Sequence, residues 1–170
     1  MRAQAALWPR LVIWSVSLAA ALWLAGCAHP PKVNTLGASQ VWTGRIAITV
    51  DSAPVQRWNA GFELQGTQNT GVLHLFSPLG QTVASAQWNP LGARLQQNNT
   101  QRDYAHMTEL TETLVGAALP LDNLFDWLQG KPTPADGWTV DTSGYAKGRI
   151  QAERLTPLPA VQLRLVLDTP

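Results

Sequence analysis

The feature that most constrains the fold is a period-two alternation of apolar and polar residues that begins after the first 40 residues. Trp42, Ile46 and Ile48 fall on one face of such a segment, and Thr43 and Arg45 fall on the other. Successive side chains of a β-strand point to opposite faces, so this spacing predicts a strand rather than a helix. Because an apolar strand face needs a cover, the pattern predicts a sheet with one side against a core.

Similar short segments, separated by turn residues, recur at hairpin spacing along the chain. The predicted strands cover residues 41–50, 58–65, 72–76, 82–88, 94–97, 102–104, 138–141, 149–154 and 161–167. Short strands at this spacing, each with one apolar face, predict an antiparallel sheet that curves around a core.

Between residues 104 and 138 the apolar spacing changes to that of a helix. Met107 and Leu114 share one helical face, with Thr108 as the predicted N-cap. A second short helix is predicted to begin near Pro120 and to end at Gly130. Strands, then helices, then strands form an α+β arrangement, in which we expect the helices to lie across the open side of the sheet.

The N-terminal segment has the pattern of an export signal. Arg2 and Arg10 accompany an uncharged apolar run at residues 11–24, and the tetrapeptide Leu-Ala-Gly-Cys ends at Cys27. The run is too short to span a bilayer comfortably, so we predict a cleaved signal peptide at residues 1–26. The tetrapeptide resembles the bacterial lipobox, which implies that the Cys27 sulfur is lipidated. The alternative is an ordinary signal peptide followed by a chance cysteine.

Cleavage before Cys27 defines two further regions. Residues 27–40 are rich in proline, glycine and polar residues and predict a flexible tether behind the lipidated cysteine. Residues 41–170 then form a single domain. Ala28 stands where such lipoproteins carry aspartate for inner-membrane retention, which implies a lipid anchor at the periplasmic face of the outer membrane of a Gram-negative bacterium.

The charge balance limits the partners. The formal net charge of the whole chain is +1, and removal of residues 1–26 with their two arginines leaves a nearly neutral protein. Nucleic-acid binding needs a basic patch with interleaved aromatic residues, which the sequence does not have. We therefore expect no nucleic-acid partner.

Catalytic motifs are also missing from the sequence. His29, His74 and His106 lie in the predicted tether, in a strand and before a helix, without the spacing of a metal site. No Gly-X-Ser-X-Gly, phosphate-binding glycine loop or second cysteine is present. We predict that the protein is not an enzyme and that it has no catalytic residue, no metal and no cofactor.

The turn between the third and fourth predicted strands carries an unexpected leucine. Pro78 and Gly80 are typical turn residues, but Leu79 lies between them at the tip, where side chains normally face water. Three interpretations are open: Leu79 packs under a neighbour, is exposed without consequence, or contacts something apolar outside the fold.

The apolar residues allow either a filled core or a cavity. Several tryptophans lie in predicted elements, and a well-filled core is the simpler interpretation of each. A half-open sheet covered by helices can instead leave an apolar cavity, which suits acyl chains. The cavity candidates are the inward apolar residues Trp42, Ile46, Ile48, Phe62, Leu64, Leu73, Leu75, Leu124 and Leu128.

Three segments resemble the LolB family of outer-membrane lipoprotein receptors. They are Trp-Thr-Gly-Arg-Ile-Ala-Ile at residues 42–48, Phe-Ser-Pro-Leu-Gly-Gln-Thr at residues 76–82, and residues 119–132, in which Leu-Pro-Leu precedes Trp-Leu-Gln-Gly-Lys-Pro. With the lipobox they occur in the family's order, and the combination is more specific than any one motif. After Pro132 the chain is more compact than the family pattern.

The resemblance implies both a fold and an activity. It implies an incomplete antiparallel β-barrel, LolA/LolB-like, whose short helices cover a cavity for acyl chains. It also implies that the protein receives lipoproteins from the periplasmic carrier LolA and inserts them into the outer membrane. Pro78, Leu79 and Gly80 would then form the membrane-insertion loop. We expect a monomer whose partners are a LolA-like carrier, lipoprotein acyl chains and, through Cys27, outer-membrane lipid.

Two rival functions are weighed against this one. A lipidated outer-membrane assembly or scaffolding protein would bind another protein with the same sheet and would have no ligand cavity. A hydrolase is a more distant rival. A packed interior would favour the scaffold, whereas an apolar cavity would favour the receptor.

Overall fold

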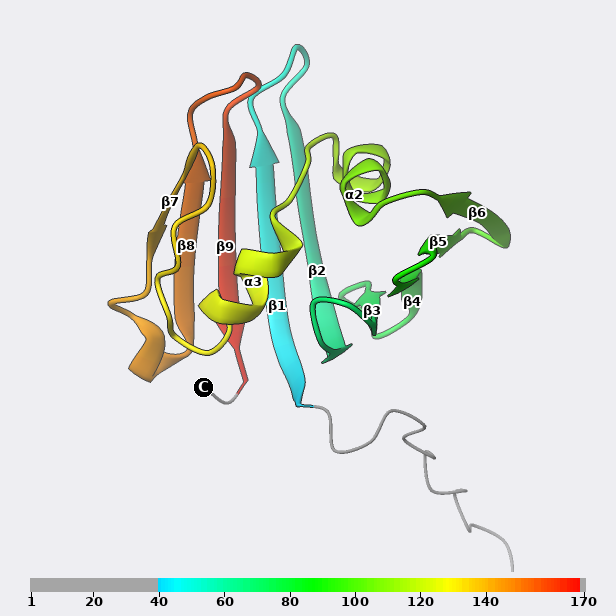
Figure 1. Ribbon diagram of the computed structural model, residues 1–170, viewed down its shortest axis with the longest axis horizontal. Helices are drawn as coiled ribbons and strands as arrows, with labels where there is room; N and C mark the ends of the chain where they lie inside the picture. The colour runs from blue at the N-terminus through cyan, green and yellow to red at the C-terminus, as the bar shows by residue number, and fades with distance from the viewer. Residues whose placement is uncertain (1–39, 169–170) are drawn as a thin grey trace, which may run out of the picture. The chain divides into compact units, whose positions relative to one another are not determined.

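One continuous antiparallel sheet runs through residues 40–168, the part of the chain that this computed structural model describes (Figure 1). Its strands are β1 (Val41–Val50), β2 (Gln56–Gly66), β3 (Gly71–Phe76), β4 (Thr82–Asn89), β5 (Gly92–Gln97), β6 (Thr100–Tyr104), β7 (Trp138–Asp141), β8 (Arg149–Arg154) and β9 (Val161–Leu167). Their order is β6-β5-β4-β3-β2-β1-β9-β8-β7. Because β6 and β7 do not pair, the barrel is open.

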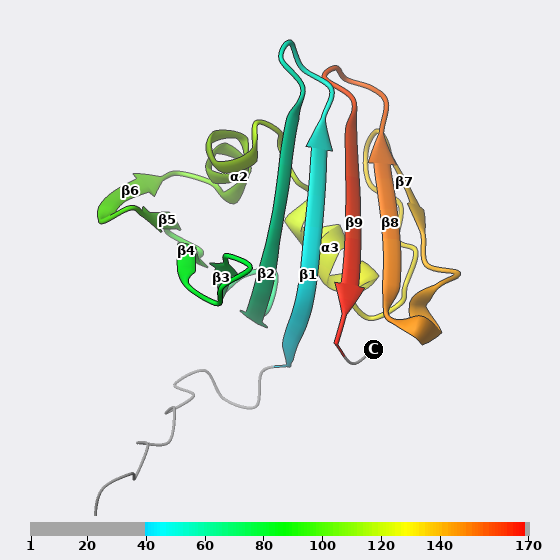
Figure 2. The ribbon, with the colours of Figure 1, turned by 180° about the vertical axis from the view of Figure 1, so that it is seen from behind.

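Two short α-helices lie on one side of this sheet. They are α2 (Met107–Val115) and α3 (Leu121–Trp127), and a 3₁₀ turn, η1 (Tyr145–Lys147), follows β7. Figures 1 and 2 show both α-helices on the same face of the β1, β2, β8 and β9 strands, with β3 to β6 curling toward α2. This arrangement confirms the predicted fold class, a half-open antiparallel barrel with helices over its opening.

The core lies between the inner face of the sheet and the two helices. In β9, Val161, Leu163 and Leu165 are buried, and the residues between them are exposed. The strand pairs with β1 in a register that sets Ile48 opposite Leu163 and Val50 opposite Val161. The period-two pattern in the sequence therefore corresponds to one apolar face along the middle of the sheet.

Aromatic side chains fix α3 to the sheet. Trp42 of β1 donates a hydrogen bond from Nε1 to the Leu128 carbonyl at 3.2 Å. Its ring meets the ring of Phe125 edge-on, with centroids 5.5 Å apart. Trp127 is fully buried and donates to the Thr133 carbonyl at 2.8 Å. Because each indole N–H has a partner, these large side chains are buried without an unsatisfied donor.

The helix start at α2 differs from the prediction. The helix begins at Met107, and His106 rather than Thr108 is its N-cap. The Glu109 carboxylate instead reaches back to accept a hydrogen bond from the Ala105 N–H at 3.3 Å. A side chain from the first turn thus satisfies a donor before the helix, and Thr108 was the wrong choice of cap.

The region after Pro132 contains three strands, β7 to β9, as the alternation predicted. None of the helices between residues 40 and 168 has the length and apolar character that a bilayer-spanning helix needs. The predicted signal peptide, Cys27 and the tether up to residue 39 lie outside the described residues.

Candidate functional site

The β3–β4 turn presents Leu79 to solvent. The Gly80 N–H donates to the Ser77 carbonyl at 2.9 Å and closes the turn, and the Ser77 N–H donates to the Gln81 carbonyl at 2.8 Å. Gly80 has φ +78, a conformation that glycine adopts without strain. Leu79 is 88% exposed, so the interpretation in which it packs under a neighbour is excluded.

A second leucine provides a comparison. Leu91 in the β4–β5 turn is 95% exposed. Leu79 and Leu91 lie beyond opposite ends of β4, because one precedes Thr82 and the other follows Asn89. Exposure alone therefore does not distinguish Leu79 from Leu91. The two leucines differ in their position relative to the rest of the site.

A mostly apolar pocket of about 110 Å³, partly open to solvent, lies between α2 and the strands β1 to β5. Ile46 and Ile48 of β1 and Leu73 and Leu75 of β3 form its sheet side. On the helix side it is lined by Met107, Leu110, Thr111, Leu114 and Val115, and by Leu119 after the helix. Asn59, Gln97 and Thr111 are its polar members, and the rest of the lining offers an apolar ligand dispersion contacts.

The nine cavity candidates fall into two groups. Ile46, Ile48, Leu73 and Leu75 line the apolar pocket. The others belong to the packed core or to the α3 side of the molecule and do not line it: Trp42, Phe62, Leu64, Leu124 and Leu128. The strands are longer than the pocket, so only part of each inner face reaches it.

The pocket also contains residues that the sequence did not identify. Trp58 of β2 is 42% exposed and Val83 of β4 is 41% exposed, and both contribute to the lining. Ala60 and Ala84 widen the pocket because their side chains are small. The alternation within β2 placed Trp58 on the same face as Ala60, but gave no sign of where the pocket opens.

The connections of α2 differ from those of α3. Neither helix has a side-chain cap at its N-terminus, and α2 ends before Gly116, whose φ is +80. Its buried residues are Leu110, Thr111, Leu114 and Val115, and Thr111 Oγ1 accepts a hydrogen bond from the Leu119 N–H at 3.1 Å. The inner face of α2 is thus mostly apolar, whereas α3 is held by indole hydrogen bonds.

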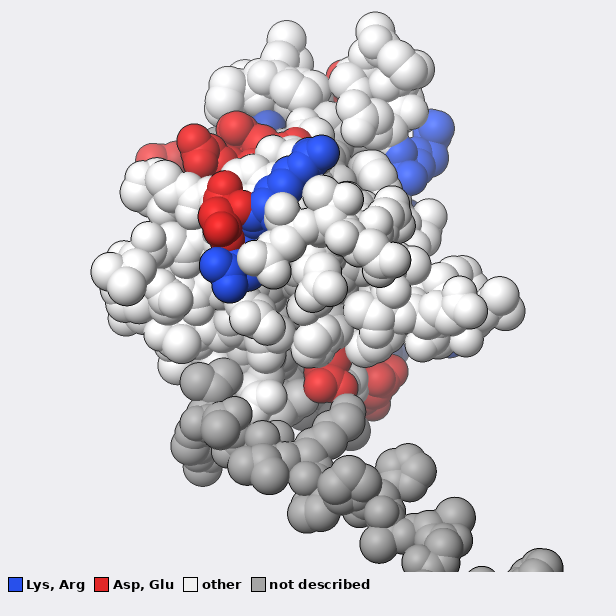
Figure 3. Space-filling view, turned by 90° about the vertical axis from the view of Figure 1, so that its right-hand side faces the viewer, with Lys and Arg blue, Asp and Glu red and all other residues white. Residues whose placement is uncertain are grey.

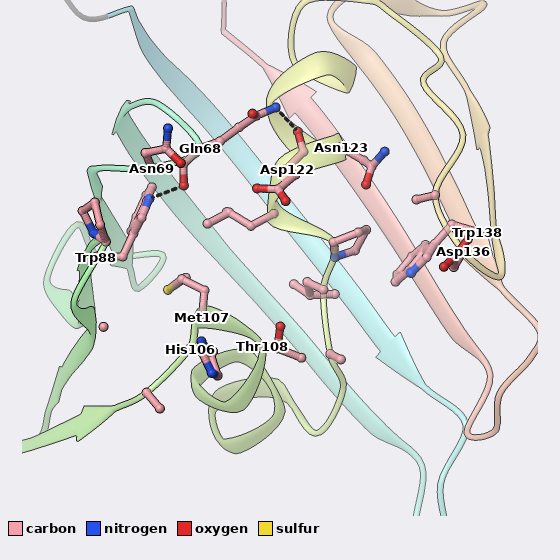
Figure 4. Close-up of a pocket in the computed structure, with 18 of the residues that line it drawn as sticks. Gln68, Asn69, Trp88, His106, Met107, Thr108, Asp122, Asn123, Asp136 and Trp138 are labelled. Atoms are coloured by element: carbon pink, nitrogen blue, oxygen red, sulfur yellow. Dashed lines mark hydrogen bonds between the residues drawn. The ribbon is translucent and has the colours of Figure 1, made fainter.

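A second, larger cavity of about 700 Å³ lies beside the first, and Figure 4 shows its lining. Its polar residues include Gln68 and Asn69 from the β2–β3 turn and Asp122 and Asn123 from α3. Gln68 Nε2 donates to the Asp122 carbonyl at 2.8 Å, which joins the turn to α3 across the cavity (Figure 4). Met107 and Leu119 line both cavities, so the two are adjacent.

The charged side chains do not gather into one patch on the side of the molecule drawn in Figure 3. Figure 3 shows the side on which β6 and α2 lie, where charges of both signs form small groups on a mostly uncharged surface. At this edge of the sheet an exposed ion pair joins Arg94 Nε and Asp103 Oδ1 at 2.6 Å. Hydrogen bonding to Arg94 lowers the pKa of Asp103 from its ordinary value. Within residues 40–168 no group of three His, Cys, Asp or Glu side chains could hold a metal ion.

The fold and site define a class of protein: a half-open β-barrel in which a helix covers an apolar pocket. The family model for the outer membrane lipoprotein LolB matches residues 39–168, and the chain belongs to this family. The sequence resemblance is thereby confirmed.

Named relatives agree with the family. The outer-membrane lipoprotein LolB of Cupriavidus metallidurans is 36% identical over 78% of this chain and 67% of its own length. The protein of that name from Bordetella pertussis is 32% identical over 86% of this chain and 87% of its own length. The protein of that name from Cupriavidus necator is 32% identical over 89% of this chain and 92% of its own length. The chain is therefore an outer-membrane lipoprotein of the receptor class and not an enzyme.

Proposed function

We propose that the protein accepts lipoproteins from a LolA-like periplasmic carrier, holds their acyl chains in the apolar pocket and inserts them into the outer membrane. It acts as a monomer, anchored through acyl chains on Cys27 and the tether at residues 27–40. The observation that carries the proposal is the pocket beneath α2, whose lining is mostly apolar.

The pocket volume indicates what must happen when a ligand binds. An apolar cavity of roughly 150 Å³ holds a molecule the size of benzene. The pocket here measures about 110 Å³, so in this conformation it holds only a short part of an acyl chain. Movement of α2 away from the sheet is the simplest way to enlarge it, because the inner face of α2 is mostly apolar and α3 is pinned by Trp42.

The opening of the pocket supports a route for delivery. Trp58 and Val83 are both partly exposed and line the pocket. Val83 belongs to β4, which begins directly after the turn that carries Leu79. An acyl chain that leaves past Val83 therefore emerges near the exposed leucine.

Leu79 supports a transient contact with the membrane. A leucine side chain contributes about 1.5–3 kcal/mol when it moves from water into hydrocarbon. This free energy biases docking of the turn but is far too small to anchor a protein, which the acyl chains on Cys27 would do. Gly80 and the hydrogen bond from its N–H keep the tip pointing outward.

The rival scaffold function has less support. A scaffold protein would have a packed interior without a ligand cavity, whereas an apolar pocket lies under α2. An interaction scaffold also has no need for a small, mostly apolar pocket. The pocket therefore favours the receptor.

The proposal is tested by a two-stage transfer assay that measures acceptance from a loaded carrier and then delivery to liposomes. Ala60→Phe should fill the pocket and reduce acceptance, since Ala60 lines it. Ala47→Phe is the matched control, because Ala47 lies in β1 next to the pocket residues Ile46 and Ile48 but is not part of the lining. Equal acceptance by the two folded variants would argue against the pocket as the acyl site.

A cellular experiment tests the same function without purified components. Depletion of the protein in its native cell should cause outer-membrane lipoproteins to accumulate on the carrier in the periplasm. If they reach the outer membrane at the normal rate, the receptor function is wrong.

A further inference from the structure

The connection between β8 and β9 carries two exposed leucines that the proposed function does not use. It spans residues 155–160, whose sequence is Leu-Thr-Pro-Leu-Pro-Ala. Leu158 is 80% exposed and Leu155 is 63% exposed. A single exposed leucine is common on protein surfaces, whereas neighbouring exposed apolar residues can form a contact surface.

The adjacent connection between β1 and β2 adds a third apolar side chain. Figures 1 and 2 show the two connections side by side at one end of the sheet. The Asp51 N–H of the β1–β2 connection donates to the Ala160 carbonyl of the other at 2.8 Å. Val55 in the β1–β2 connection is exposed. We call Val55, Leu155 and Leu158 the apolar end of the sheet.

The backbone of the β8–β9 connection has few polar groups that need partners. Pro157 and Pro159 have no N–H. The Pro159 carbonyl accepts a hydrogen bond from Arg154 Nη2 at 3.3 Å, and the Ala160 carbonyl accepts the bond from Asp51. Thr156 carries the one polar side chain of this connection. Because an unpaired backbone group is costly in hydrocarbon, this composition suits contact with lipid better than that of an ordinary polar loop.

Arg154 fixes the base of the connection to the rest of the fold. This arginine of β8 is buried, and its Nη1 donates to the Ala118 carbonyl after α2 at 3.3 Å. Its guanidinium lies over the ring of Trp138, 5.7 Å from the centroid, within the range of a cation–π contact. The leucines are thus presented from a braced base, so a contact does not first have to order the connection.

The family and the tether indicate the partner. The chain belongs to a family of outer-membrane lipoproteins, so a bilayer is the apolar surface that stays nearest to it. With the proposed anchor on Cys27, the 13 residues 28–40 can reach at most roughly 45 Å. The ten residues of β1 span only about 33 Å. The tether therefore allows either end of the sheet to face the bilayer.

The strand directions relate the apolar end to Leu79. All the neighbouring pairs from β8 through β9, β1 and β2 to β3 are antiparallel. The strands β1, β3 and β8 therefore run in the same direction, and the connections that follow them leave from the same edge of the sheet. One of these connections is the turn with Leu79, whereas Leu91 follows β4 and lies at the opposite edge.

We propose that Val55, Leu155 and Leu158 form a second membrane-contact surface, whose side chains enter the hydrocarbon of the bilayer and orient the domain on it. The proposal goes beyond the receptor function and does not depend on it. The exposed charged residues nearest to this surface in the sequence are Asp51, Arg57 and Glu153, which limit how deeply the apolar end enters. Because the three contact residues are uncharged, the contact should not need anionic lipid, and salt should change it little.

The test uses the lipidated protein in vesicles of a zwitterionic phospholipid. Cys27 is the only cysteine, and its acylated sulfur would not react, so Leu158→Cys provides one site for an environment-sensitive fluorophore. Leu91→Cys is the matched control, because Leu91 is also exposed but lies at the opposite edge. Nitroxide groups on the lipid acyl chains quench a fluorophore only when it enters the hydrocarbon.

We expect the nitroxide lipids to quench the fluorophore at position 158 and not at position 91, at low and at high salt. A second measurement leaves Leu158 in place and carries the fluorophore at Val55→Cys. Leu158→Glu should then lower the insertion equilibrium constant, measured from the quenched fraction at position 55, by about tenfold or more. Leu91→Glu should leave this constant unchanged.

The outcomes decide between lipid and other partners. Equal quenching at positions 158 and 91, or quenching at neither, overturns the proposal, as does an unchanged constant in the Leu158→Glu protein. Emission at position 158 that ignores lipid but changes when a LolA-like carrier is added assigns the surface to a protein partner and also overturns it. The vesicles contain no client lipoprotein, so a failure here leaves the receptor function standing, and the transfer assay tests that function separately.

Discussion

Leu79 and Val83 connect the outside of the molecule with its apolar pocket through one turn. Leu79 is 88% exposed at the tip, and Val83, in the strand that follows, lines the pocket. A ligand at Val83 is thus close in sequence to the side chain that we propose enters the membrane. This relationship links the two halves of the proposed activity, acceptance and delivery.

Replacement of Leu79 should affect delivery and not acceptance. Leu79→Glu places a carboxylate at the tip, and its burial in hydrocarbon is costly. Folding and uptake from the carrier should be nearly unchanged, because the Leu79 side chain is exposed and does not line the pocket. The two-stage transfer assay should show normal acceptance and at least about a tenfold slower delivery to liposomes.

Leu91→Glu is the matched control for this experiment. Leu91 is 95% exposed and lies beyond the other end of β4, away from the pocket. Delivery by the Leu91 variant should match that of the unmodified protein. An equal effect of the two substitutions, or an effect of neither, would show that the tip has no special part in insertion.

The anchor prediction concerns Cys27. Cys27→Ala removes the thiol that would be acylated, so the product should be uncleaved or released from the outer membrane. Mass spectrometry of the purified protein and fractionation of the cell measure both results. Normally acylated protein from this mutant would contradict the assignment of the lipid to Cys27.

The pocket should also affect stability. Leu110 of α2 is fully buried and lines the pocket. Leu110→Ala should lower the free energy of unfolding by about 2–5 kcal/mol, since it removes apolar contacts and enlarges an existing cavity. Denaturant unfolding measures the loss, with Leu91→Ala as the exposed control, whose effect should stay within about 0.5 kcal/mol. If the free energy of unfolding falls by a similar amount in both variants, α2 does not pack as described.

A separate prediction concerns the attachment of α3. Trp42→Phe keeps the apolar ring but removes the hydrogen bond to the Leu128 carbonyl. That carbonyl also accepts a bond from the Tyr145 hydroxyl at 3.3 Å, so it keeps one partner. The free energy of unfolding should fall by about 1 kcal/mol. Acceptance from the carrier should remain normal, because Trp42 does not line the apolar pocket; a selective loss of acceptance would place the acyl site near α3.

The sequence predicted the elements well because their signals are local. Alternation in β1 and β9 reflects one buried face, and the change to helical spacing at Met107 is equally local. The open, helix-covered barrel follows from the order of these elements and from the family resemblance. The α2 N-cap was misplaced because the Glu109 side chain, rather than Thr108, serves the entering chain.

The pocket was harder to predict because it depends on where the helices cross the strands. Period two shows that Ile46, Phe62 and Leu64 can each point inward, but not which of them meets a void. In the structure Phe125 of α3 packs against Trp42 of β1, whereas α2 leaves the space beside Ile46. The burial of Arg154 at the end of β8 could not be predicted either, because an arginine at the end of a strand is usually exposed.

The central claim is that acyl chains occupy the apolar pocket, and a photoreactive acyl chain tests it most directly. A client lipoprotein that carries a diazirine in its fatty-acyl chain is transferred from the carrier to the receptor, irradiated and analysed by peptide mapping. The account predicts cross-links to Ile48, Leu75 and Leu110, which line the pocket from β1, β3 and α2. Cross-links confined to residues outside this lining, such as Arg45 and Arg164, which are exposed on β1 and β9, would contradict it.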